Sequence, residues 1–110
     1  MDSFPKRGDL YWICLDPTVG TEIKKTRPCV VLSNNAQNKM STRLIIAPIT
    51  SNVSKFHPFE ARVMVKEREG KVMLDQVRSV DKSRLGRYIS SLDLSTMDDV
   101  DQAIKIAFAL

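Results

Sequence analysis

The chain contains few of the residues that most often bind metals or transfer protons. It has one histidine, His57, and two cysteines among 110 residues. Any mechanism that depends on a pair of histidines is therefore excluded, and a zinc site built from cysteine and histidine lacks ligands. His57 precedes Pro58 in a polar stretch, which is typical of an exposed loop histidine. We therefore expect neither a metal nor a cofactor.

Long hydrophobic runs are also absent. No run approaches the roughly 18 apolar residues that a membrane helix needs. Residues 1–7 contain no apolar core of a secretory signal. We therefore expect no membrane segment and a cytoplasmic location. Cys14 and Cys29 lie inside apolar runs, so we expect both to be buried, reduced thiols.

The length and charge of the chain fit a small globular protein with a polyanionic partner. A chain of 110 residues supports one domain, here residues 1–110, with a modest core. An apolar face is then available for a second subunit. The formal net charge of +4 and the pI near 9.3 are compatible with binding to RNA, although many basic proteins bind no nucleic acid.

Hydrophobic patterning predicts a mainly β protein with one helix. We expect strands over residues 10–15, 28–33, 44–49, 59–65, 71–80 and 88–92, the first of them buried on both faces. Residues 34–39 are expected to form a turn-rich connection, and residues 67–70 a hairpin turn. Pro48 is expected to create a local edge or bulge, because proline cannot donate a ladder hydrogen bond.

The C-terminal segment is the one clearly helical pattern. Ser95 is a possible cap of this helix, and Met97, Val100, Ile104 and Ala107 fall on one face at helical spacing. A shorter helical turn is expected after Asp81, with this residue as its cap. Five to seven short strands closed by one helix suit a small, strongly bent barrel.

Basic and polar side chains collect at expected strand ends. Lys24, Lys25 and Arg27 stand at the start of the second strand, and Thr50-Ser51 closes the third. The planar arginine fork matches a phosphate, and hydroxyls at a strand end can bind one as well. A solvated charge run and an ordinary turn remain the alternatives. The segment of residues 75–78 places the polar side chains of Asp75, Gln76 and Arg78 inside an otherwise apolar stretch, which is unusual because buried polar groups are costly unless paired.

Five short runs, in order, resemble the MazF/PemK family of toxins. They are Arg7–Trp12 with its Gly-Asp pair and aromatic strand, Asp16–Glu22 with the D-P-x-x-G-[ST]-E pattern, Arg27–Ser33 with R-P-x-V-V-[LI]-[SQ], Ile49–Ser51, and Leu74–Lys82 with D/E-Q-[VI]-[RK]-[ST]-[VI]. Each run alone is weak evidence. Together they extend over nearly the whole chain, and they identify it as similar to this family.

The resemblance implies an SH3-like barrel with a C-terminal helix, of the kind shared with CcdB gyrase poisons. It also implies a homodimer that cuts single-stranded RNA without a metal and leaves 2′,3′-cyclic phosphate and 5′-hydroxyl ends. The implied partner is an antitoxin with a flexible, acidic C-terminal tail. Such a tail would mimic the RNA backbone in a basic groove.

The family's functional positions carry over to several residues of this sequence. The implied catalytic residues are Arg27, Thr50 and Glu22, the last as a proton acceptor. The RNA-binding positions that we expect are Lys24, Lys25, Ser51, Lys55, Asp75 and Gln76. Some PemK-type members carry a histidine in the first loop, whereas this chain has lysines there. The resemblance therefore supplies no histidine as the general base and leaves Glu22 as the implied proton acceptor.

Two other functions fit the same expected barrel. The first is a CcdB-like inhibitor of DNA gyrase that binds its partner without cleavage. CcdB-type poisoning relies on C-terminal residues that include a tryptophan, whereas the only tryptophan here is Trp12, on the first strand. The second is an RNA-binding barrel without catalysis. Cleavage of RNA distinguishes the toxin interpretation from both alternatives.

Overall fold

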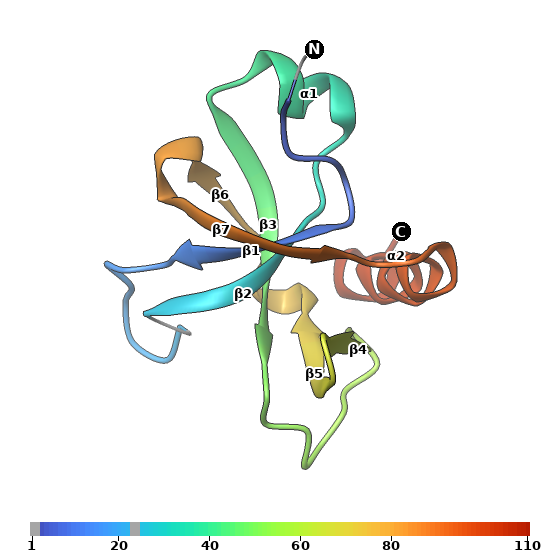
Figure 1. Ribbon diagram of the computed structural model, residues 1–110. Coiled ribbons are helices and arrows are strands. Elements are labelled where there is room, and N and C mark those ends of the chain that lie inside the picture. Colours follow the sequence, from blue (N-terminus) through green and yellow to red (C-terminus); the bar gives the residue numbers. More distant parts are fainter. Residues whose placement is uncertain (1–2, 23–24) are drawn as a thin grey trace.

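The computed structural model describes residues 3–22 and 25–110, which form mainly β-strands (Figure 1). The strands are β1 (Asp9–Cys14), β2 (Thr26–Val31), β3 (Arg43–Thr50), β4 (Glu60–Val65), β5 (Arg68–Met73), β6 (Arg78–Asp81) and β7 (Leu85–Ser91). The helices are α1 (Asn35–Met40) and α2 (Leu94–Phe108), with 3-10 turns η1 (Leu74–Gln76) and η2 (Lys82–Arg84). The predicted set of five to seven short strands with one C-terminal helix is confirmed.

The strands form one curled antiparallel sheet with β3 at its centre. The order is β4-β5-β3-β2-β1-β7, and β6 pairs with β3 outside this path. One edge of β3 pairs with β2. Its other edge pairs with β6 through residues 43–46 and with β5 through Ile49 and Thr50. Figure 1 shows the consequence, since the β4–β5 hairpin lies at the end of the sheet opposite α1.

Pro48 lies where β3 changes from one partner to the other. The amide of Leu32 donates to the carbonyl of Ile45 at 2.8 Å, so Ile45 directs its hydrogen-bonding groups toward the segment of β2. Because these groups alternate along a strand, the nitrogen of Pro48 faces the opposite edge. That edge is unpaired at this point, between the β6 and β5 contacts. The predicted local edge is therefore present, although β3 as a whole is the central strand.

Two apolar clusters bury opposite faces of the central strands. The first lies between the sheet, the β4–β5 hairpin and α2, and contains Leu10, Val30, Ala47, Ile49, Ala61, Val63, Val72, Leu74, Met97, Val100 and Ala103. The second lies toward β6 and contains Ile13, Leu15, Cys29, Val31, Leu44, Ile46 and Val80. Strands β2 and β3 contribute to both clusters, as expected for strands buried on both faces.

The prediction that the first strand is buried on both faces is wrong for β1. Trp12 is 41% exposed and Cys14 is exposed, whereas Leu10 and Ile13 are fully buried. The expectation of two buried thiols therefore fails for Cys14. It holds for Cys29, whose burial raises the pKa of its thiol to about 12. The exposed side of Trp12 lines a cavity of the structure.

Two connections differ from their predicted form. Residues 71–80 are not one strand, because η1 interrupts them between β5 and β6. Residues 35–40 form the short helix α1 rather than only a turn, and Asn34 caps it by accepting a hydrogen bond from the amide of Gln37 at 2.8 Å. The Asn38 side chain holds this helix to the sheet, because it is fully buried and donates to the carbonyl of Ser33 at 2.8 Å.

The helix caps were predicted correctly in one case and wrongly in the other. Asp81 accepts a hydrogen bond from the amide of Ser83 at 2.9 Å and caps η2, as expected. Helix α2 begins at Leu94, so its cap is Asp93, which accepts from the amide of Thr96 at 2.8 Å. Ser95 lies inside the first turn and is not the cap.

Helix α2 packs its apolar face on β4 and η1. Met97, Val100 and Ala103 are buried, and Ile104 packs against the same cluster, whereas Ala107 is exposed. The predicted face is therefore confirmed for the first three turns only. Among the residues described, no helix has the length and apolar character needed to cross a membrane.

Candidate functional site

A cavity of about 410 Å³ opens between β1, β2, the end of β3 and the β4–β5 hairpin. It is called the Arg27 pocket below. Its lining residues are Trp12, Thr26, Arg27, Pro28, Ile49, Thr50, Ser51, Val65, Lys66, Arg68, Glu69, Gly70 and Ile89. The pocket therefore brings together three residues that the sequence singled out, namely Arg27, Thr50 and Ser51.

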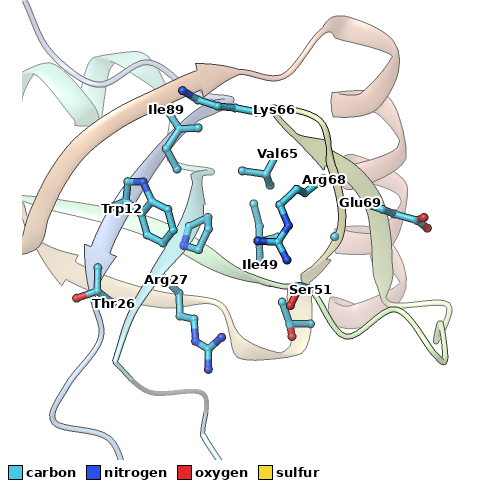
Figure 2. Close-up of a pocket in the computed structure, with 13 residues that line it drawn as sticks. Trp12, Thr26, Arg27, Ile49, Ser51, Val65, Lys66, Arg68, Glu69 and Ile89 are labelled. Carbon is cyan, nitrogen blue, oxygen red and sulfur yellow. The ribbon is translucent and has the colours of Figure 1, made fainter.

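The floor of the Arg27 pocket is apolar. Trp12 and Pro28 are direct partners in the β1–β2 ladder, so their side chains stand on one face of the sheet. Alternation along the strands puts them on the same face as Leu10 and Val30 of the first apolar cluster. The floor of the pocket therefore extends the first apolar cluster past the part of the sheet that α2 covers. Figure 2 shows Trp12 and Ile89 along one side of the cavity.

Arg27 and Thr50 occupy matching positions on neighbouring strands. The last pair of the β2–β3 ladder is Cys29 with Pro48, and each strand continues two residues further to reach Arg27 and Thr50. Residues two apart in a strand share a face, so both side chains belong to the face opposite the apolar floor. In Figure 2 the guanidinium of Arg27 points away from the Trp12 indole.

The charges around the Arg27 pocket are mainly positive. Among its described lining residues, Arg27, Lys66 and Arg68 are cations and Glu69 is a carboxylate. The carboxylate of Glu69 forms an ion pair with Arg62, and Figure 2 shows it pointing away from the cavity. The rim of the pocket therefore carries cationic and hydroxyl groups around its apolar floor, an arrangement that suits a phosphate.

Thr50 and Ser51 begin a loop of residues 51–59 between β3 and β4. The hydroxyl of Thr50 accepts a hydrogen bond from the amide of Asn52 at 3.2 Å, and the Asn52 side chain accepts from the hydroxyl of Ser54 at 2.9 Å. Thr50 is half-buried and Ser51 is exposed. The first turn of the loop is thus organised around the Thr50 hydroxyl.

A smaller second cavity of about 150 Å³ holds three other predicted residues, Glu22, Asp75 and Gln76. It is called the Glu22 pocket, and Pro48, Val77 and Arg78 complete its lining. The carboxylate of Glu22 accepts a hydrogen bond from the amide of Val19 at 2.6 Å. Glu22 is therefore not among the residues lining the Arg27 pocket. Pro48 stands two residues before Thr50 on the same face, so the two cavities adjoin along β3.

Of the predicted lysines, the described residues Lys25 and Lys55 line neither cavity. Lys24 lies outside the described residues. Lys25 is exposed, and its amide donates to the carboxylate of Asp16 at 3.1 Å. Lys55 is exposed in the loop after β3, and its backbone carbonyl accepts a hydrogen bond from Lys71 at 2.7 Å. These side chains are free to contact a long ligand outside the cavities.

The contribution of the β4–β5 hairpin was missed by the sequence interpretation. Arg68 and Glu69 were assigned only to a turn and Lys66 was given no functional role, yet all three line the Arg27 pocket. Their positions depend on Gly70, since an added Cβ would stand 2.9 Å from Ile49 Cγ2 and 3.1 Å from the Thr50 carbonyl oxygen. Gly70 thus lets β5 approach β3 closely. The one available signal was a glycine placed after a run of charges.

The described residues contain no group of three or more histidine, cysteine, aspartate or glutamate side chains arranged to hold a metal ion. The side chains at the Arg27 pocket support phosphate binding and charge stabilisation by Arg27, with hydroxyl donors from Thr50 and Ser51 beside it.

Comparison with known proteins gives one consistent result. Residues 6–108 match the family described as PemK-like, MazF-like toxin of type II toxin–antitoxin system. Endoribonuclease EndoA of Bacillus subtilis is 39% identical, over 96% of this chain and 95% of its own length. These two matches extend across all strands and the C-terminal helix.

Solved structures share the fold over the same range. The crystal structure of MazF from Deinococcus radiodurans is 27% identical, with a TM-score of 0.86, and covers 99% of this chain and 100% of its own. A mycobacterial endoribonuclease in complex with its cognate antitoxin is 23% identical, with a TM-score of 0.81 and coverage of 96% of both chains. At that identity, the second likeness establishes the fold alone.

Proposed function

We propose, since this chain belongs to the PemK-like, MazF-like toxin family, that it is an endoribonuclease acting at the Arg27 pocket. The relative with 39% identity, EndoA, is an endoribonuclease matched over nearly its whole length. The observation that carries the site assignment is the lining of one cavity by Arg27, Thr50 and Ser51.

The substrate in this proposal is single-stranded RNA that supplies its own nucleophile. The ribose 2′-oxygen attacks the adjacent phosphorus and forms a new O–P bond, while the bond from phosphorus to the 5′-oxygen breaks. A base takes the 2′-proton, and an acid returns a proton to the 5′-oxygen. The products are a 2′,3′-cyclic phosphate and a 5′-hydroxyl. DNA lacks the 2′-hydroxyl and is not cut.

Arg27 and Thr50 act on the charge that develops in this reaction. The guanidinium of Arg27 binds the phosphoryl oxygens, and the hydroxyl of Thr50 donates a second hydrogen bond. Their common face and matching positions on β2 and β3 support a shared phosphate. Both are mounted on strand ends, which are rigid supports for such groups. No step of this mechanism requires a metal ion.

The RNA strand follows the face that Arg27 and Thr50 share. Lys25, Ser51 and Lys55 bind neighbouring phosphates, and Lys24 belongs to the same proposed set. A base enters the Arg27 pocket against its apolar floor, because unpaired bases stack on aromatic side chains. Asp75 and Gln76 contact the RNA in the adjoining Glu22 pocket, whose nearness to Thr50 along β3 supports this path.

Glu22 remains the proposed acceptor of the 2′-proton. Its pocket adjoins the face of Thr50, which supports the assignment, whereas its hydrogen bond with the Val19 amide means that the carboxylate must turn to act. Glu69 is the competing carboxylate, because it lines the Arg27 pocket itself. A comparison of variants at these two positions decides between them.

The active form in this proposal is a cytoplasmic homodimer controlled by an antitoxin. The family description places such toxins in type II toxin–antitoxin systems. The antitoxin's acidic C-terminal tail binds the cationic rim of Arg27, Lys66 and Arg68 and excludes RNA from it. The CcdB-like alternative is not favoured, because the matches are to MazF-type endoribonucleases.

Incubation of the purified protein with mixed-sequence RNA in excess EDTA tests this function. We expect cleavage at a limited set of sequences, with cyclic phosphate and 5′-hydroxyl ends identified by end-specific ligation. A matched DNA substrate serves as the control and should stay intact. Binding of RNA without cleavage, or cleavage only when divalent ions are restored, would contradict the proposal. Sequencing of the cut ends also identifies the recognised sequence.

A further inference from the structure

Lys71 is a buried cation directly beside the proposed site. It is the partner of Thr50 in the β3–β5 ladder, so the two side chains share a face of the sheet. Its side chain is 11% exposed, and that of Glu60, its ion-pair partner at 3.0 Å, is 5% exposed. Buried lysines are rare and costly unless they are well paired. This pair therefore needs an explanation beyond sheet formation.

Both members of the pair also bind the backbone of the loop that follows Thr50. The Nζ of Lys71 donates to the carbonyl of Lys55 at 2.7 Å. The Oε1 of Glu60, which accepts from Lys71, also accepts from the amide of His57 at 2.8 Å. One ion pair thus holds the loop at two points, on either side of Phe56. Charge-assisted hydrogen bonds of this kind are about twice as strong as neutral ones.

Phe56 lies between the two attachment points, which are the backbone groups of Lys55 and His57. The guanidinium of Arg62 lies 4.3 Å from the centre of its ring, and the ammonium of Lys71 lies 5.7 Å from it. Both distances are within the range of cation–π attraction. The loop therefore covers the outer face of β4 and β5 at the Lys71–Glu60 pair, whereas the Arg62 side chain beside it stays 62% exposed.

We propose that the Lys71–Glu60 pair positions the loop of residues 51–59 for RNA binding. The near end of this loop is set by the Thr50 hydroxyl, and the far end by the ion pair. Fixing both ends presents Ser51 and the Lys55 side chain to the RNA in one arrangement, so less loop entropy is lost on binding. This inference rests on the proposed endoribonuclease function, and it names two positioning residues for it.

The test compares Lys71→Met with Lys71→Arg, using an RNA oligonucleotide that the wild-type protein cleaves. Methionine keeps a long, unbranched side chain and removes the ammonium. We expect KM to rise about tenfold, because lost hydrogen bonds to a charged group typically account for at least that factor. The value of kcat should change less than KM, because Arg27 is carried by β2 and the backbone of Thr50 is still held in the β3–β5 ladder. Arginine retains donors for both Lys55 and Glu60, so Lys71→Arg should restore KM.

Amide hydrogen exchange supplies a readout that needs no RNA. The His57 amide is bonded to Glu60, so its exchange should accelerate in Lys71→Met and recover in Lys71→Arg. Asp101→Asn is the control variant. It removes the ion pair between Arg7 and Asp101, whose N–O distance is 2.6 Å, and neither residue contacts the loop of residues 51–59 in that pair. If Lys71→Met folds poorly, Glu60→Gln takes its place as the test variant, because it removes the charge of Glu60 with little change in shape.

The outcomes separate the two proposals. Unchanged KM in Lys71→Met, at temperatures where it remains folded, means that the pair only stabilises the fold and overturns the positioning role. Unchanged exchange at His57 overturns it as well. If the wild-type protein does not cut RNA, the proposed function fails, and the exchange measurement still decides whether the ion pair fixes the loop.

Discussion

Arg27 and Thr50 stand across from one another, each two residues beyond Cys29 and Pro48, the last pair of the β2–β3 ladder. Neither residue is near the other in sequence, so only the antiparallel pairing of β2 with β3 brings them together. The pairing also places them between two cavities, the apolar Arg27 pocket and the polar Glu22 pocket.

Replacement of Arg27 by lysine tests the role of the planar fork. Lysine keeps the charge but loses the paired donors, so we expect the single-turnover cleavage rate to fall by roughly 10²–10³. The matched control is Arg43→Lys, at the opposite end of β3 from Thr50. Circular dichroism checks that both variants fold. Cleavage by Arg27→Lys at the wild-type rate would show that the fork is not used.

A pair of glutamine variants tests the identity of the general base. Glu22→Gln keeps the hydrogen-bond acceptor for Val19 and removes the proton-accepting carboxylate, so we expect loss of the acidic limb of the pH–rate profile and a rate loss of about 10²-fold or more. Glu69→Gln is the comparison, since Glu69 lines the Arg27 pocket but points outward. A larger loss in Glu69→Gln than in Glu22→Gln would reverse the assignment.

The salt dependence of RNA binding tests the exposed Lys55 side chain. For single strands, each neutralised phosphate contributes about −0.7 to the slope of log affinity against log salt concentration. Lys55→Ala should therefore flatten this slope by about that amount and leave the recognised sequence unchanged. Lys105→Ala is the control variant. Lys105 is an exposed residue of α2, so its replacement should leave the slope unchanged. Fluorescence anisotropy in an Arg27→Ala background, which does not cut the RNA, gives the affinities.

The Asp93 cap predicts a pH-dependent contribution to stability. Hydrogen bonding from the Thr96 amide lowers the pKa of the Asp93 carboxyl in the folded protein. The cap therefore stabilises the fold fully above the unfolded pKa, near 4, and its contribution is lost as the pH falls through the lower folded value. Asp93→Ala should lower Tm at pH 7 relative to wild type, and the difference should shrink as the pH falls below about 4.

Ser95→Ala serves as the control for the cap. Ser95 lies inside the first turn of α2, so its replacement should change Tm little at either pH. An equal loss in Ser95→Ala and Asp93→Ala, or a loss in Asp93→Ala that persists unchanged at low pH, would contradict the assignment of Asp93 as an ionised cap. Thermal unfolding monitored by circular dichroism across the pH range makes the measurement.

The sequence singled out Arg27 and Thr50 because local patterns and family motifs coincide at these residues. Arg27 and Thr50 stand in recognisable runs at strand ends, and the structure places both in one cavity. Lys71 was missed, because a lysine in a strand of alternating pattern is ordinarily assigned to the solvent face. Lys71 is buried on that face because the loop of residues 51–59 folds back over β5.

The same limit explains the other errors. Trp12 belongs to an apolar, aromatic run that looks fully buried, but no element of the described structure covers its face beyond the end of α2. The division of the predicted site into two cavities also depends on η1, which interrupts an otherwise strand-like stretch. Both features arise from tertiary packing between distant segments, which single-sequence periodicity does not report.

The change of partner at Pro48 has a consequence for how β3 finds its alignment. A strand with apolar residues on both sides gains little from hydrophobicity in choosing one alignment, because a slip by one residue exchanges one apolar side for the other. Proline removes this ambiguity, since a slip would turn its nitrogen, which carries no hydrogen, toward β2 and leave a carbonyl there without a donor. The missing amide hydrogen of Pro48 therefore keeps β3 in one register with β2.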